Sequence, residues 1–242
     1  MHSERRFGIH THRCVSLRGS ESARLCSRCC ADAARSIVQY KADEDKLTQL
    51  DKYKLLGATG PTGDRNNFCE YIQKNIHLYE LRTGVELSTH AAAKYTRNQL
   101  AEALRRNPYQ VSLLLGGWDK STGPSLFYMD YLGSMHQMKI ASHGYASYFA
   151  LSIMDRYWRE GLSVEEAVGL LGKCIDELKT RFILNLSEFK IKIVDKDGVR
   201  DLNPDPPAPE INMGKLVDKE APLAVMEDTA PESAAAASSK MS

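Results

Sequence analysis

The sequence has no long apolar run and almost no net charge. Its 32 lysines and arginines nearly balance 31 aspartates and glutamates, which leaves a formal charge of +1 over 242 residues. This balance gives no electrostatic reason to expect a nucleic acid or an anionic membrane as a partner. No stretch reaches the length of apolar residues that crosses a bilayer. No continuous apolar segment near the start has the form of a secretory signal.

Cysteine is scarce in the body of the chain. Of the six cysteines, four lie in the first thirty residues, and only Cys69 and Cys174 lie further on. Both fall in helical patterns, where a free cysteine behaves as a small apolar residue. Because a secreted disulfide framework would distribute its cysteines differently, we expect the body of the protein to be intracellular and reduced.

Composition divides the chain into three regions. Residues 1–34 are rich in arginine, cysteine and serine and contain no lysine. Residues 35–202 carry regular apolar patterns and are predicted to form one folded domain, since the chain is long enough for a substantial core. Residues 203–242 hold six of the nine prolines and few large apolar residues. They are predicted to be a disordered tail, because they cannot bury enough surface to offset the entropy of ordering.

Strand-like and helix-like segments alternate in groups within the central region. In chain order we predict strands at 37–40, 47–50 and 54–58, helices at 64–84 and 88–106, strands at 111–115 and 126–130, helices at 145–161 and 163–178, and strands at 189–193 and 199–202. Helices that arrive in pairs argue against simple βαβ winding. The order predicts an α+β fold with two packed sheets and a helix pair on each outer face, a four-layer αββα sandwich.

Nine short stretches between about Ala33 and Leu202 together resemble the β-type subunits of the 20S proteasome. They are Arg35–Val38, Asp45–Leu47, Gly63–Arg65, Glu70–Asn75, Asn107–Tyr109, Leu126–Tyr131, His143–Ala146, Met154–Tyr157 and Ile193–Gly198. Their number, order and spacing over about 170 residues make the resemblance specific. It is greatest to the class called beta-4 in ring order, or beta type-2. It implies the four-layer fold of the N-terminal-nucleophile hydrolases, which agrees with the predicted layers.

The resemblance also implies partners and a cellular role. The family forms seven-membered rings stacked four deep, so the expected partners are the other α and β subunits of a 28-subunit core, together with assembly chaperones. The expected role is to build the inner β ring of the complex that degrades ubiquitin-tagged proteins. The expected location is the cytoplasm and nucleus, and no cofactor is expected.

Active β subunits of the family use a threonine at the mature N-terminus, whose hydroxyl attacks the peptide carbonyl while its own free amine helps to take the proton. This threonine is released by cleavage between Gly and Thr, and no Gly-Thr dipeptide occurs in the chain. The resemblance adds that beta-4 subunits lack the threonine. We therefore expect a non-catalytic structural subunit that is not itself an enzyme, within a complex that is a threonine-type endopeptidase. We expect no catalytic, cofactor-binding or metal-binding residues.

The alternative function is that of an active N-terminal-nucleophile hydrolase. Lys46 matches the position at which active relatives place a lysine that tunes the nucleophile, although without a nucleophile a structural or solvent-facing role is favoured. Cleavage between Gly19 and Ser20 would expose a serine, but the residues that follow do not make the apolar strand that must hold a nucleophile.

Other patterns favour structural roles over chemistry. The residues His10, His12, Cys14, Cys26 and Cys29 include types that bind zinc, but a lone Cys-x-x-Cys with loosely spaced partners is a weak signal.

The stretch 57–64 resembles a phosphate loop in glycine content only. It lacks the Gly-Lys-Ser/Thr sequence that grips phosphate, so a strand-to-helix connection is favoured. His143 has no identifiable catalytic partner and is expected to pack in the interior or at an interface.

An aromatic-rich segment is expected to lie mostly in the core. Some of its members are candidates for subunit contacts, where aromatic residues are enriched. The segment contains Tyr128, Tyr131, Tyr145, Tyr148, Tyr157 and Trp158.

Residues 1–34 depart from the family pattern. Phe7-Gly8-Ile9 resembles the start of the family's first strand, but arginine- and cysteine-rich sequence stands where an apolar run should follow. The first β-hairpin of the fold is therefore in doubt, and its loss would leave an unpaired sheet edge.

Overall fold

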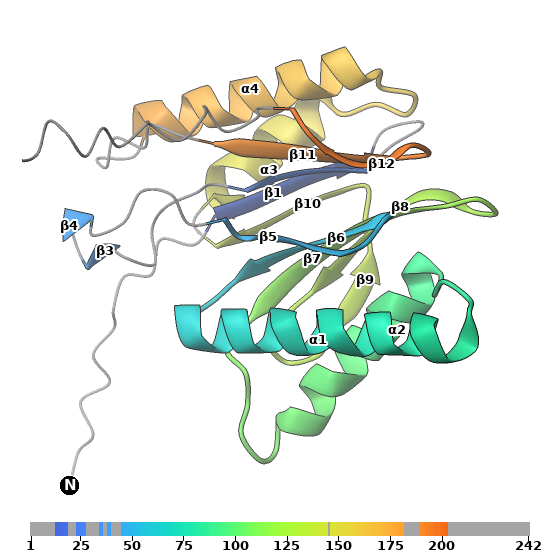
Figure 1. Ribbon diagram of the computed structural model, residues 1–242. Coiled ribbons are helices and arrows are strands. Elements are labelled where there is room, and N and C mark those ends of the chain that lie inside the picture. The colour runs from blue at the N-terminus through green and yellow to red at the C-terminus, as the bar shows by residue number, and fades with distance from the viewer. Residues whose placement is uncertain are drawn as a thin grey trace, which may run out of the picture. The chain divides into compact units, whose positions relative to one another are not determined.

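The structure is a computed structural model of the chain (Figure 1). It describes residues 45–144, 146–181 and 189–202, together with the backbone of four short strands before residue 45. All of these residues belong to one compact unit. The predicted tail at 203–242 lies outside the described residues.

One sheet has five antiparallel strands in the order β5-β6-β7-β8-β9. The strands are β5 (Leu47–Asp51), β6 (Lys54–Thr59), β7 (Ser112–Asp119), β8 (Gly123–Met129) and β9 (Met135–Gln137). Every residue of β6 is buried, because helices cover one face of this sheet and the second sheet covers the other.

The second sheet also has five antiparallel strands, in the order β10-β1-β2-β11-β12. The strands are β1 (Arg13–Arg18), β2 (Ala23–Ser27), β10 (Ile140–Gly144), β11 (Lys190–Asp195) and β12 (Gly198–Asp201). A separate pair is made by β3 (Ala34–Arg35) and β4 (Val38–Gln39).

The doubt about whether the first β-hairpin forms is wrong. β1 and β2 form this hairpin and lie in the middle of the second sheet. Val15 pairs with Cys26 across the hairpin, while Val15 also pairs with Ser142 of β10 and Cys26 with Ile191 of β11. Backbone hydrogen bonds on both sides hold the hairpin without a continuous apolar run. Val15 and Leu17 are two residues apart and are separated by Ser16. This is a period-two strand signal, which a description by overall composition does not show. The folded unit therefore includes strands from the segment at 1–34.

Two helices cover each sheet, as predicted. The helices α1 (Thr62–Thr83) and α2 (Thr89–Ala103) lie on the outer face of the β5–β9 sheet. The helices α3 (Ser147–Tyr157) and α4 (Val164–Arg181) lie on the outer face of the other sheet. Figure 1 shows the resulting order of layers, helices–sheet–sheet–helices, which confirms the α+β sandwich.

Three apolar clusters fill the spaces between the layers. The first lies under α1 and α2 and includes Phe68 and Ile72, and the second lies under α3 and α4 and includes Met154 and Leu171. The third lies between the sheets and includes Leu55, Leu114 and Leu126. Each cluster stabilises one contact between layers.

Capping interactions are formed at the helix ends. Gly84 ends α1 in a left-handed conformation with φ of 68°, and its amide donates to the Glu80 carbonyl. Ser163 and Glu166 form a capping box before α4, with each side chain accepting from the other's backbone amide. The predicted end of α2 at 106 is wrong, because the helix stops at Ala103.

Several details differ from the sequence predictions. The short strands β9 and β10 were not predicted. Tyr71 and Tyr79 of α1 and Tyr157 of α3 are exposed. Tyr71 lies beside the buried stripe of α1, whereas Tyr79 and Tyr157 keep the spacing of the buried stripes but lie near the C-terminal ends of their helices. None of the helices in the described part of the chain has the length and apolar character of a membrane span.

Candidate functional site

Lys46 lies directly before β5 and is only 2% exposed, so its predicted solvent-facing alternative is wrong. Its carbonyl accepts a hydrogen bond from the Ala58 amide of β6. The preceding Asp45 accepts one from the Leu47 amide at 2.8 Å and one from the Lys192 ammonium of β11 at 2.9 Å. The backbone that carries Lys46 is therefore tied to both sheets.

A small pocket of about 180 Å³ opens beside Lys46. Its lining residues are Asp45, Lys46, Thr48, Arg65, Asn66, Cys69 and Glu70. Burial lowers the pKa of Arg65. Burial also raises the pKa of Cys69 to about 11, against the opposing effects of a hydrogen bond with Thr48 and the charge of Arg65. Cys69 is therefore a neutral thiol at physiological pH and a poor nucleophile.

His143 links the two sheets through their shared interior. It projects from β10, and its Nε2 donates to the Leu113 carbonyl of β7 at 3.0 Å. Its ring stacks on Tyr128 of β8 with 4.2 Å between the ring centroids. Burial lowers the pKa of His143 to about 4, although the Leu113 and Met129 carbonyls and Asp130 act in the opposite direction. The imidazole is therefore neutral at pH 7, which agrees with the expected packing role.

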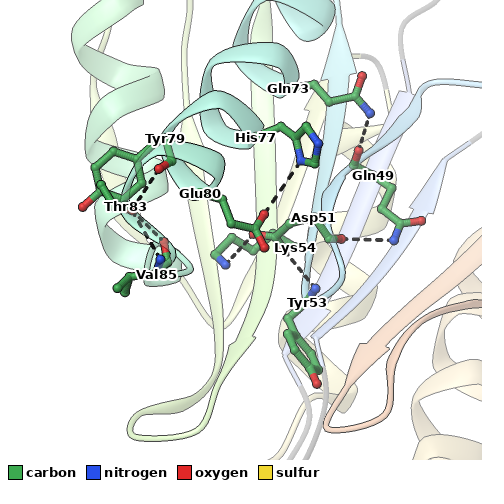
Figure 2. A network of polar contacts seen from close by, with 10 residues as sticks. All are labelled: Gln49, Asp51, Tyr53, Lys54, Gln73, His77, Tyr79, Glu80, Thr83 and Val85. Carbon is green, nitrogen blue, oxygen red and sulfur yellow. Dashed lines mark hydrogen bonds and ion pairs between the residues drawn. The ribbon is translucent and has the colours of Figure 1, made fainter.

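A polar network holds the β5–β6 turn against α1, as Figure 2 shows. The ammonium of Lys54 and a carboxylate oxygen of Asp51 are 2.7 Å apart, and both side chains are largely buried. The other Asp51 oxygen accepts from the Tyr53 amide at 2.8 Å. On the α1 side, the Gln73 amide group donates to the Gln49 carbonyl at 2.7 Å. β5 is an edge strand of its sheet, and within the described part of the chain no strand pairs with its outer edge. The side-chain network helps to hold β5 in place without such backbone pairing.

The zinc pattern and the Gly19-Ser20 cleavage site, both alternative interpretations of residues 1–34, fall mostly outside the described residues. His10, His12, Cys29 and the Gly19-Ser20 dipeptide lie outside the described residues. The backbones of Cys14 and Cys26 lie on β1 and β2, but in the register Cys14 pairs with Ser27 rather than with Cys26. The zinc pattern therefore stays an untested alternative. Among the described residues, no cluster of three or more His, Cys, Asp or Glu could hold a metal ion.

The glycine-rich stretch 57–64 connects β6 to α1, as favoured from the sequence. Asp64 in the first turn of α1 accepts a hydrogen bond from the Gln110 amide. The carboxylate thus bonds to the protein's own backbone at the place where a phosphate loop would bind its ligand.

Sequence reasoning missed the buried polar residues Lys54, Thr89 and Ser125. Lys54 begins an apolar strand three residues after an aspartate, which was a visible signal for a buried ion pair. The hydroxyl residues gave no comparable signal, since Thr89 and Ser125 occur near a helix start and a turn, where such residues are common on the surface.

The aromatic segment divides between the interior and the surface. Tyr128 is partly buried against His143, whereas Tyr131, Tyr148 and Tyr157 are exposed. The expectation that most of these residues form core is therefore wrong, and the exposed members remain available for contacts with a partner.

Comparison with known proteins identifies the family. Residues 14–194 match the family model described as proteasome subunit. The chain is 51% identical to proteasome subunit beta type-2-B of Arabidopsis thaliana over 169 residues, which cover 70% of this chain and 85% of that protein. It is 46% identical to proteasome subunit beta type-2 of Dictyostelium discoideum over 179 residues, 72% of this chain and 90% of that protein. It is 45% identical to the probable proteasome subunit beta type-4 of Schizosaccharomyces pombe over 175 residues.

These relatives contradict the prediction that the chain is not an enzyme. They are β-type subunits, and the β type includes the catalytic subunits of the proteasome. Membership of this family therefore argues against the prediction that the chain has no enzymatic role. The missing Gly-Thr dipeptide and the resemblance to beta-4 subunits were the grounds for that prediction, and neither is an observation of the mature N-terminus. Residues 1–12 lie outside the described residues.

The matched family model, the identity to named β subunits and the four-layer fold together show that this chain belongs to the proteasome subunit family, as a β-type subunit.

Proposed function

We propose that this chain is a subunit of the inner β ring of a 20S proteasome core and supports protein degradation by assembling with the other α and β subunits. The observation that carries the proposal is the exposure of large apolar side chains on both outer helix layers. Monomeric proteins rarely gather such side chains on their surface unless a partner covers them. A subunit within a stack of rings has neighbours above and below, which this arrangement fits.

The first exposed set lies on the outer face of α1 and the loop that follows it. Leu78, Leu81 and Val85 are 42%, 70% and 61% exposed. Leu78 and Leu81 are three residues apart and share one side of α1, and Val85 follows directly after the Gly84 cap. Phe68, Ile72 and Ile76 lie on the opposite side of the helix, in the core. The outer side of α1 therefore carries exposed apolar side chains near its C-terminal end, beyond the exposed pair of Glu70 and Lys74.

The second exposed set lies on the α3 and α4 layer. Tyr148 is 76% exposed and Tyr157 is 46% exposed. Beside Tyr157 a groove of about 520 Å³ is lined by residues that include Arg156, Lys173 and Glu177. Aromatic and arginine side chains with charged neighbours are typical of protein–protein contacts.

Purification through an affinity tag on this chain tests the proposal. Native mass spectrometry of the purified material should find the chain in stoichiometric amounts within a particle of four seven-membered rings, which gives the proposed 28 subunits. Partially built particles should also contain assembly chaperones. Recovery of the chain only as a free monomer would overturn the proposal.

The ubiquitin-tagged substrates and the cytoplasmic and nuclear location are proposed on the family resemblance alone. Depletion of the chain should raise the level of ubiquitin conjugates, and a fluorescent fusion should appear in both compartments. Unchanged conjugate levels, or a fusion confined to another organelle, would contradict these two points.

A second candidate function, that of an active N-terminal-nucleophile hydrolase, is favoured by the geometry of Lys46. This residue matches the lysine of active relatives, and it is buried on backbone that is tied to both sheets. The candidate requires a Thr, Ser or Cys at the mature N-terminus. Mass spectrometry of that terminus, and of any covalent adduct with a threonine-protease inhibitor, decides it: another terminal residue and no adduct would exclude this function.

A further inference from the structure

A row of polar residues crosses the β5–β9 sheet beneath the start of α2. Gly117 of β7 pairs with Lys54 of β6 on one side and with Ser125 of β8 on the other. Direct partners in an antiparallel ladder point to the same face. That face is the helix side, since a Cβ on Gly117 would lie 2.5 Å from the hydroxyl of Thr89 in α2. Lys54, Thr89 and Ser125 therefore gather around one glycine.

Two hydroxyls in this row are buried without a partner. Thr89 is 0% exposed and Ser125 is 5% exposed. Neither hydroxyl has a hydrogen-bond partner among the described residues. A buried hydroxyl that makes no hydrogen bond destabilises the folded state, and buried polar groups in native proteins are nearly always satisfied by protein or ordered water. Two such groups beside the same glycine call for a shared partner.

Charge around the row favours a neutral partner over an anion. The ammonium of Lys54 is already paired with Asp51 at 2.7 Å, and it has three donors, so it can donate further without an unbalanced charge. The amide of Thr89 at the start of α2 already donates to both oxygens of Asp119 at 3.0 Å. The positive end of the helix is therefore occupied by a carboxylate.

A cleft next to the row reaches Lys54. It has a volume of about 250 Å³ and is also lined by Ser88, Trp118 and Asp119, which lie close to Thr89 and Gly117 in the chain, whereas Thr89 and Ser125 themselves do not line it. A water molecule in the liquid takes about 30 Å³, and a buried one makes about three hydrogen bonds. The row supplies three polar side chains.

We propose that Lys54, Thr89 and Ser125 bind an ordered water molecule that joins β6, β8 and the first turn of α2. The water accepts from the ammonium of Lys54 and exchanges hydrogen bonds with the two hydroxyls. It anchors α2 to the sheet at the point where Gly117 allows the closest approach. This inference does not depend on the proposed function.

Isosteric removal of the hydroxyls tests the water site in the full chain. Thr89→Val and Ser125→Ala should each lower the melting temperature by about 3 °C, because each removes a ligand of the water. The double variant should melt close to the single variants, because both changes disrupt one site. If no water binds and the two hydroxyls make no hydrogen bond, Thr89→Val and Ser125→Ala should each raise the melting temperature, and the two increases should add.

Thr96→Val is the matched control. Thr96 is also buried in α2, but its hydroxyl already donates to the Ala92 carbonyl at 2.8 Å. Its replacement removes a hydroxyl that already has a hydrogen-bond partner in the protein. Thr96→Val therefore measures the change in melting temperature caused by a Thr-to-Val change in this helix when no water ligand is removed.

A high-resolution density map of the full chain, alone or in its complex, gives a second measurement that does not depend on stability. It should show a peak within about 2.7–3.2 Å of the Thr89 and Ser125 hydroxyls. The peak should be absent from the double variant. A map that resolves other buried waters but shows none here would overturn the proposal.

Discussion

The two outer helix layers expose different chemistry. On α1 and the following loop the exposed residues Leu78, Leu81 and Val85 are aliphatic. On α3 and α4 the exposed Tyr157 lies beneath the ammonium of Lys173, 4.4 Å from the ring centroid, in a groove lined by charges of both signs. Within the proposed ring, we expect the first layer to bind its neighbour mainly by apolar burial and the second to depend on charge.

The largest effect is expected from a charge on the aliphatic layer. Leu81→Glu should reduce incorporation into core particles by about a hundredfold or more, because an unpaired carboxylate would be buried in the contact. The measure is the ratio of variant to wild-type chain in purified particles. Lys74→Ala, on the same outer side of α1, should assemble normally, since Lys74 makes only an exposed pair with Glu70. Equal incorporation of the Glu variant would mean that no partner covers α1.

A second prediction concerns the interior between the layers, where no partner is involved. The pKa of His143 is about 4 in the folded chain and about 6.5 when unfolded. The unfolded chain therefore binds more protons between these values, so stability is full above pH 6.5 and falls as the pH drops toward 4. The loss approaches about 3 kcal/mol.

Chemical denaturation of the full chain at several pH values measures this loss. His143→Gln should flatten the dependence between pH 6.5 and 4, because glutamine does not titrate. An unchanged slope in that variant would assign the acid sensitivity to other groups.

A third prediction separates the charged layer from the aliphatic one. Lys173→Glu should reduce incorporation by about tenfold and should make the remaining assembly more sensitive to salt, since it reverses a charge in the α3–α4 groove. Lys179→Glu is the matched control, because Lys179 is exposed on the same helix but does not line the groove. If both reversals act alike, the effect comes from net charge and not from the groove.

The smallest effect is expected where a residue supports a layer without contacting a partner. Ser163→Ala removes one half of the capping box before α4 and should cost about 1 kcal/mol of stability. Incorporation into particles should be unchanged, as judged by the same purification. A loss of incorporation as large as that of Lys173→Glu would show that the α3–α4 layer acts through its rigidity.

Features of the fold that depend on neighbouring residues were predicted from the sequence, whereas features that depend on distant strands were not. The αββα order followed from local periodicity, which depends on nearby residues. The β1–β2 hairpin was missed because pairing with β10 and β11 stabilises it, and these partners lie more than a hundred residues away.

The candidate site was predicted only in part, for a similar reason. Lys46 was identified by resemblance, but its burial comes from packing that no local pattern records. The exposure of Tyr71 and Tyr157 was also hidden, because the spacing of an aromatic residue on a helix is the same whether a sheet, a partner subunit or solvent covers it.

A cryo-electron microscopy map of particles purified through this chain tests most directly whether both of its helix layers are covered in a 20S core. We predict that neighbouring subunits cover both Leu81 on α1 and the α3–α4 groove beside Tyr157. A complete particle in which either helix layer of this chain faces solvent would contradict it.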